Sequence, residues 1–335
     1  MTTATDRNRS DFNYVSEKFG GGPFDADILW RDAAGDNVVW LMNNNTPSNT
    51  AALPTVTPDW HLKAVVNVDD FDPLPGKPDL SNPEVLWQND NGALVIWQIS
   101  GTNVFGMHAL PNPGPAWHVV GVNDFDGFET GGDILFQNNN GALALWTGIS
   151  SAMGTVQHMY AGTQNPGPTW HVLGTGDTDG NFNSSILWQH DSGALALWKN
   201  GSLNDLTGTL TFSTLAALPT VNSSWHVKGM QDLSGDGRSD IVFQHDSGAV
   251  AVWEMNGTTI TATNLVNLNP GPAWHIVALR NMDGDAHVDI LFQNDNGAAA
   301  VWENYQSLGG GLATFNIVAS INPNPNPNGH VWDLL

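Results

Sequence analysis

The sequence predicts an all-β protein folded as a six-bladed β-propeller with four antiparallel strands per blade. Three observations support this prediction. A fourteen-residue hairpin segment recurs six times, a Trp-His element precedes five of the hairpins, and the chain begins and ends at different points of the repeat. Repeats of about 50 residues that hold four short strands each are typical of propeller blades.

The hairpin segments share one pattern. Each has an aliphatic run, a polar turn that contains Gly, and a second apolar run that closes on Trp. The turn glycine supplies the positive φ angle that a tight hairpin turn requires. The first segment differs, because Gly35-Asp36 replaces the usual Asn-Gly or Ser-Gly. The six segments, expected to form strands b and c, are Asp27–Trp40, Glu84–Trp97, Asp133–Trp146, Ser185–Trp198, Asp240–Trp253 and Asp289–Trp302.

A short apolar run that begins with Trp is expected to form strand a of each blade. It often follows a Pro-rich turn such as Asn112-Pro113-Gly114-Pro115, and the stretch after each hairpin, such as Thr155–Ala161, is expected to form strand d. Five of these runs begin with Trp-His: Trp60-His61, Trp117-His118, Trp170-His171, Trp225-His226 and Trp274-His275. With Trp332, successive strand-a tryptophans are 49 to 58 residues apart.

All 15 tryptophans of the chain occupy repeat positions. Six begin strand a, and three, Trp30, Trp87 and Trp188, share a strand-b position with phenylalanines of the other blades. The remaining six close strand c and are expected to pack between blades: Trp40, Trp97, Trp146, Trp198, Trp253 and Trp302. No tryptophan remains for a unique active site.

The two ends of the chain are expected to meet in one blade. The first hairpin begins at strand b, whereas Val331-Trp332-Asp333-Leu334-Leu335 resembles a strand a. The C-terminal strand would then complete the first blade and close the ring, which leaves no open sheet edge between blades. We therefore expect an N-terminal segment at residues 1–24 and one propeller domain at residues 25–335.

Composition restricts the partners and the cellular location. With 10 Lys+Arg against 33 Asp+Glu, the net charge of −23 disfavours nucleic acid and anionic lipid. The absence of Cys excludes disulfides and thiolate metal sites. No apolar stretch is long enough to cross a membrane, and no cleavable signal peptide is visible. We expect a soluble protein that is exported or displayed at the cell surface, with cytoplasmic storage as the alternative and homo-oligomer formation left open.

The loops between strands a and b are acidic and could hold structural Ca²⁺. Alternating carboxylates around Gly can converge hard oxygen ligands on this ion. The alternative is that these side chains cap the turns by bonding to the backbone. The strongest patterns lie in blades five and six, with candidate ligands Asp232, Asp236, Asp240, Asp283, Asp285 and Asp289, whereas the loop from Asp124 to Asp133 is irregular by one residue.

The full pattern, W-H-V-x-G-x-x-D-x-x-G-D-G-x-x-D-I-L-F-Q-N-x-x-G-x-x-A-x-W, resembles FG-GAP/VCBS-type propeller repeats of bacteria. It is also similar to the repeats of fungal and bacterial β-propeller lectins. The resemblance extends from about residue 25 to Leu335. It implies sugar sites repeated between neighbouring blades and, in many members, Ca²⁺ in the a–b loops. Because such repeats also serve as adhesion modules and spacers, the resemblance is specific for the fold and weak for the function.

One face of the ring is expected to present the b–c turns beside the strand-a Trp-His pairs. An aromatic ring binds the apolar face of a sugar, and amides and carboxylates bind its hydroxyls. Packing between blades and fixed structural hydrogen bonds are the alternative roles for these Trp and His residues. The candidate ligand-binding residues are the five Trp-His pairs, Trp60, His61, Trp117, His118, Trp170, His171, Trp225, His226, Trp274 and His275, together with Asp90, Asn139, Asp191, Asp246 and Asp295.

The leading functional hypothesis is a multivalent lectin that binds glycans or glycoconjugates. The alternative is an adhesion or protein-interaction propeller with structural Ca²⁺-binding loops, as part of an exported system. Five blades keep Trp-His and a strand-b Gln, which favours repeated small-ligand sites. The first blade has Arg31 instead of Gln and no His after Trp332, so its site is expected to be weak or empty. The residues that break the repeat form no recognisable catalytic motif, so we expect no enzymatic activity.

Overall fold

A computed structural model describes residues 27–43, 46–66, 68, 84–127, 132–282, 287–321 and 332–334. The expected N-terminal segment at residues 1–24 and the candidate ligands Asp283 and Asp285 lie outside these residues. The described part consists of β-strands and turns without a helix, and none of it forms an apolar helix long enough to cross a membrane.

The strands form six antiparallel four-stranded units. Neighbouring strands of each unit are consecutive in the chain, except that β24 opens unit 1. Unit 1 contains β24 (Trp332–Leu334), β1 (Ile28–Asp32), β2 (Asn37–Asn43) and β3 (Thr46–Leu53). Unit 2 contains β4 (Trp60–Val66), β5 (Glu84–Asn89), β6 (Leu94–Ser100) and β7 (Asn103–Leu110). Unit 3 contains β8 (Trp117–Asn123), β9 (Asp133–Asn138), β10 (Leu143–Ser150) and β11 (Thr155–Gly162).

Units 4 to 6 repeat the same order. Unit 4 contains β12 (Trp170–Gly176), β13 (Ser185–His190), β14 (Leu195–Asn204) and β15 (Thr209–Leu218). Unit 5 contains β16 (Trp225–Gln231), β17 (Asp240–His245), β18 (Val250–Asn256) and β19 (Thr259–Val266). Unit 6 contains β20 (Trp274–Arg280), β21 (Asp289–Asn294), β22 (Ala299–Gly309) and β23 (Leu312–Ile321). Within each unit the four strands correspond to the strands a to d of the sequence repeat.

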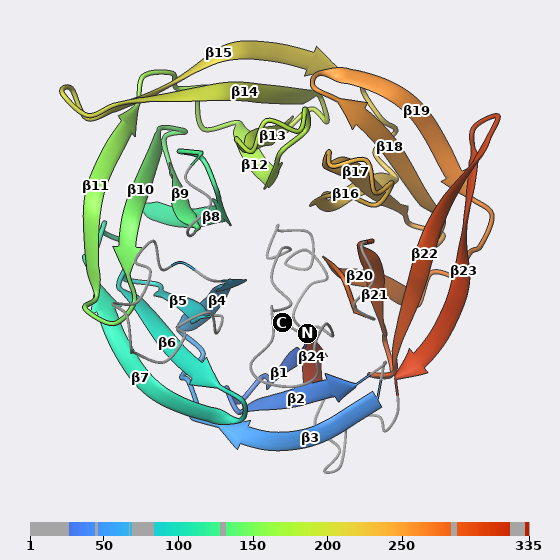
Figure 1. The fold of residues 1–335 in the computed structure, drawn as a ribbon, viewed down its shortest axis with the longest axis horizontal. Helices are drawn as coiled ribbons and strands as arrows, with labels where there is room; N and C mark the ends of the chain where they lie inside the picture. The colour runs from blue at the N-terminus through green and yellow to red at the C-terminus, as the bar shows by residue number, and fades with distance from the viewer. Residues whose placement is uncertain are drawn as a thin grey trace.

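The units surround a central axis, consistent with a β-propeller. Figure 1 shows the strand-a positions nearest the axis and the strand-d positions on the outside. The strands β8, β12, β16 and β20 are neighbours in that order. The expected pairing of the C-terminal strand with the first hairpin is present, because Trp30 and Arg31 of β1 lie opposite Leu334 and Asp333 of β24.

The sheet arrangement differs from six separate four-stranded blades. Units 1 and 2 are separate sheets, but units 3 and 4 form one eight-stranded sheet and units 5 and 6 form another. Outer strands β11 and β15 pair in parallel, as do β19 and β23. The hairpins β14–β15 and β22–β23 have strands of 10 or 11 residues, against 7 or 8 in the other units. Their extra length lets them reach the outer strand of the preceding unit.

Aromatic pairs between strands b and c form the centre of each unit. The strand-b rings are at most 1% exposed and the strand-c tryptophans at most 9%. Their ring centroids are 4.6–5.1 Å apart in all six units. Burying such pairs is favourable through both area and ring geometry. The expectation that the strand-c tryptophans pack in the core is therefore confirmed.

Apolar packing also joins the units. One buried cluster contains Leu29 of unit 1, Trp87 of unit 2 and Phe136 of unit 3. A second joins Trp30 of unit 1 to Leu291 of unit 6. Because unit 1 packs against both of its neighbours, the first and last parts of the chain are held in one assembly.

Candidate functional site

The b–c turns lie directly beside the start of strand a in five units. In each, the backbone N–H of the first turn residue donates to the carbonyl of the residue before the strand-a Trp, over 2.9–3.0 Å. These donors are Asp90, Asn139, Asp191, Asp246 and Asp295. The backbone therefore brings each b–c turn to the start of strand a, where the Trp and the His that follows it point to opposite sides of the strand.

The strand-a His and the turn Asp or Asn form a side-chain pair in each of these units. The distances between His Nε2 and the side-chain oxygen are 2.7–2.9 Å. The pairs are His61–Asp90, His118–Asn139, His171–Asp191, His226–Asp246 and His275–Asp295. We call each such pair, with its strand-a Trp, a Trp-His unit site.

The unit sites are accessible to solvent. The four paired aspartate side chains are 56–69% exposed, and the strand-a tryptophans are half-buried. The hydrogen bond with His226 holds the pKa of Asp246 below its usual value. Asp246 is therefore ionised at neutral pH and offers a negative acceptor to His226.

The strand-b glutamines have a structural role that sequence reasoning missed. Gln88 Nε2 donates to the carbonyl of Trp117 in the next unit (2.8 Å), and Val119 N donates to Gln88 Oε1 (2.9 Å). Gln137 and Gln244 bridge the backbone of the next strand a in the same way. Because these amides clamp neighbouring units, the recurrence of Gln in the repeat does not require a ligand.

Arg31 replaces this clamp at the junction of units 1 and 2. Its guanidinium donates to the carbonyls of Trp60 (2.6 Å), Val56 and Thr57 (both 3.0 Å), and its Cζ lies 5.2 Å from the centre of the Trp87 ring. Desolvation by burial lowers the pKa of Arg31. Arg31, which stands where the other units have Gln, thus also binds backbone carbonyls at the junction, three of them in all.

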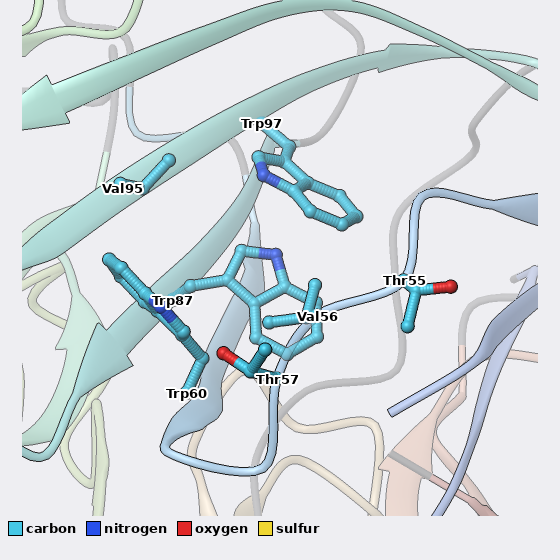
Figure 2. A pocket seen from close by; sticks show the side chains of 7 residues that line it. All are labelled: Thr55, Val56, Thr57, Trp60, Trp87, Val95 and Trp97. Carbon is cyan, nitrogen blue, oxygen red and sulfur yellow. The ribbon is translucent and has the colours of Figure 1, made fainter. Parts of the chain in front are cut away.

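A pocket of about 260 Å³ lies at the same junction. Trp60 borders it, with Trp87 and Trp97 of the same unit and the segment that enters β4 on its other side (Figure 2). The lining residues are Thr55, Val56, Thr57, Trp60, Trp87, Val95 and Trp97. Of these residues, the sequence indicated only Trp60 as a candidate ligand-binding residue. The replacement of the usual Asn-Pro-Gly, as at Asn112-Pro113-Gly114, by Thr55-Val56-Thr57 was the available signal.

In the loop of unit 5, the acidic side chains bind the protein itself. Asp232 accepts the N–H groups of Gly235, Asp236 and Gly237, and Asp236 pairs with Arg238. Asp240 accepts three further backbone N–H groups, and Asp289 accepts that of Met282. These hydrogen bonds match the turn-capping alternative for Asp232, Asp236 and Asp240. The metal prediction for these loops stays a prediction.

A different loop brings three carboxylates together. Among the described residues, Asp124, Asp126 and Asp133 are the group whose ligand oxygens all lie within 4.8 Å of one another. Burial raises the pKa of Asp124. Asp124 and Asp133 also accept backbone N–H groups of their own loop, so the closeness of the three carboxylates is what distinguishes this loop among the described residues. The sequence pattern ranked this loop lower because of its extra residue.

The comparisons with known proteins identify one repeat. Residues 232–292 match the model of the FG-GAP-like repeat. A comparison with curated proteins found no match. Solved structures that are similar to parts of this chain include the mitotic checkpoint complex. That match has 10% sequence identity and a TM-score of 0.46, and it covers 93% of this chain and 78% of that chain.

Two further solved structures match this chain with similar sequence identity and TM-score. One is BBS1N in complex with ARL6DN, with 11% identity and a TM-score of 0.45 over 83% of this chain and 74% of that chain. The other is Raptor of Chaetomium thermophilum, with 10% identity and a TM-score of 0.48 over 96% of this chain and 28% of that chain. The FG-GAP resemblance of the sequence rests on the match of the repeat model to residues 232–292 alone.

Proposed function

We propose that this protein is a multivalent lectin whose sugar sites repeat on one face of a six-bladed propeller, one four-stranded unit per blade. The observation that carries the proposal is the recurrence of the Trp-His unit site. Five times, an exposed His–Asp or His–Asn pair lies at the start of a strand that begins with a half-buried Trp.

The chemistry of a unit site suits a sugar. The ring face of a Trp binds the apolar C–H face of a pyranose, while carboxylate, amide and imidazole groups bind its hydroxyls. A single site of this kind, being shallow and solvent-exposed, would bind weakly. Repetition on a rigid ring raises the overall affinity for clustered glycans through effective concentration.

The experiment is a glycan array followed by isothermal titration with a monovalent methyl glycoside of the strongest hit. More than one site per chain is expected. Replacing Asp295 by Ala should lower the number of sites by about one, while the outer-strand variant N103A should leave the number unchanged. A stoichiometry near one, or no glycan binding at all, would overturn the proposal.

We also propose a structural Ca²⁺ site, which is separate from the sugar sites. The carboxylates Asp124, Asp126 and Asp133 would hold it, since their oxygens converge and hard oxygen ligands suit Ca²⁺. Its role would be to fix the loop between β8 and β9, away from the unit sites.

The FG-GAP-like repeat and the propeller-like fold also suggest a protein-interaction propeller. The observation that favours this second candidate is the exposed apolar side chains of the outer strands. Phe105 and Met107 on β7 are each 50% exposed, and Leu215 on β15 is 52% exposed. Substituting Phe105 and Met107 by Ser should abolish binding to a protein partner and leave glycan binding intact, whereas D295A should remove about one glycan site and leave the protein partner bound.

A further inference from the structure

The five unit sites are of two kinds, distinguished by the residue that ends strand b. This residue is Asn in units 2, 3 and 6 and His in units 4 and 5. It lies opposite the strand-a Trp in every case: Trp60↔Asn89, Trp117↔Asn138, Trp170↔His190, Trp225↔His245 and Trp274↔Asn294.

Both residue types hold the b–c turn by the same bond. In the Asn units, the backbone N–H two residues on donates to the Asn Oδ1 over 3.0–3.1 Å. In the His units, Ser192 N and Ser247 N donate to Nδ1 of His190 and His245 over 3.0 Å. In both residue types a side-chain atom next to the strand thus receives the same backbone N–H of the turn.

The residue two positions after the end of strand b differs between the two kinds of turn as well. Ser follows each His, and its Oγ lies 2.8–2.9 Å from the His Nδ1. Asn follows each Asn, and its Oδ1 accepts the N–H of the first residue after the turn glycine. The turns are therefore two complete alternatives, Asn-x-Asn-Gly and His-Asp-Ser-Gly.

Only the His turns place a ring against the strand-a Trp. The centroids of Trp170 and His190 are 5.1 Å apart at 61°, and those of Trp225 and His245 are 5.0 Å apart at 64°. Within the described part of the chain, Trp60, Trp117 and Trp274 make no comparable ring contact. The fixed imidazole thus occupies space beside Trp170 and Trp225 that a smaller amide occupies in the other units.

We propose that the residue at the end of strand b determines ligand specificity, and this inference rests on the proposed lectin function. Units 2, 3 and 6 form one class of sugar site, with the strand-a Trp ring available to the sugar. In units 4 and 5, His190 and His245 place an imidazole against that ring, so these units do not bind the same sugar with the same affinity.

The chain supplies its own matched variants. The substitutions H190N, S192N, H245N and S247N convert both His turns to Asn-Asp-Asn-Gly, the sequence of the natural turn at Asn89–Gly92. The reverse change, N294H with N296S, converts the unit-6 turn to His-Asp-Ser-Gly, as at His190–Gly193. Both sets reproduce turns that already fold in this protein, and circular dichroism with thermal melts checks that each variant folds.

Isothermal titration with a panel of methyl glycosides of neutral hexoses, deoxyhexoses and N-acetylhexosamines tests the proposal. The wild type should bind one glycoside at about three equivalent sites, the fourfold variant at about five, and the N294H/N296S variant at about two. Five equivalent sites in the wild type, or no change in the fourfold variant, would overturn this inference alone. No glycoside binding by any of the proteins would overturn the lectin function together with it.

Discussion

Gln88 of one unit and Trp117 of the next are joined through the side chain of one and the backbone of the other. Gln88 donates to the Trp117 carbonyl and accepts the N–H of Val119, over 2.8 and 2.9 Å. The two bonds satisfy the backbone on both sides of His118, which carries a unit-site side chain. The clamp therefore connects ring assembly to the position of the candidate ligand residues.

Replacing Gln88 by Ala should destabilise the protein, because two partly or fully buried backbone groups lose their partner. The expected loss in the free energy of unfolding is about 1–3 kcal/mol. Chemical denaturation measures this loss, with Q306A on an exposed position of β22 as the control. Equal unfolding midpoints for Q88A and Q306A would show that Gln88 does not act as a clamp.

Glycines at one repeat position should differ in their tolerance of Ala. Gly141 and Gly193 both have φ near +90°, but a Cβ at Gly141 would overlap the backbone of Gly167, whereas a Cβ at Gly193 meets no atom within 4 Å. The backbone strain of a positive φ costs about 1–2 kcal/mol in both variants. G141A should lose about 1–3 kcal/mol more. Thermal melts that show equal losses would contradict the close approach of the b–c and d–a turns.

Asp240 should make stability depend on pH. Burial raises its pKa to about 7 despite three hydrogen bonds from backbone N–H groups. Because the folded state then binds this proton more tightly than the unfolded state, the contribution of Asp240 to stability is complete below about pH 4 and is lost as the pH rises to about 7. In EDTA, this residue should contribute a decrease on the order of 4 kcal/mol.

The measurement is the unfolding free energy of the wild type and D240N at several pH values. D240N should be less stable at low pH and show a flatter pH dependence between pH 4 and 7. The exposed carboxylate variant D236N should keep the wild-type slope. A D240N slope equal to that of the wild type would show that Asp240 titrates normally.

Calcium should raise the melting temperature if the Asp124 loop holds it. An ion present at about 100 times its dissociation constant stabilises the folded state by about 2.7 kcal/mol. Melts in Ca²⁺ and in EDTA should differ for the wild type and coincide for D124N/D126N. The variant D232N/D236N separates this site from the unit-5 loop, because its Ca²⁺ response should remain. Identical melts of the wild type with and without Ca²⁺ would count against both loops.

The repeat made much of the fold predictable. The hairpins, the strand that begins with Trp, the pairing of β24 with β1 and the buried strand-c tryptophans all follow from residues that recur at fixed spacing. The juxtaposition of His61 with Asp90 was also foreseeable, because antiparallel pairing places the end of strand b beside the start of strand a. Periodicity determines these contacts since each one lies within a single unit.

Contacts between units could not be predicted in this way. The sequence by itself determined six similar four-stranded units and the side chains on one face. The tertiary structure decided that Gln88 clamps the next unit, that Arg31 reaches three carbonyls beside a pocket, that Asp124, Asp126 and Asp133 converge, and that long hairpins merge units 3 and 4. The reason is geometric: these distances depend on how the rigid units pack around the axis, and no local spacing in the chain encodes that packing.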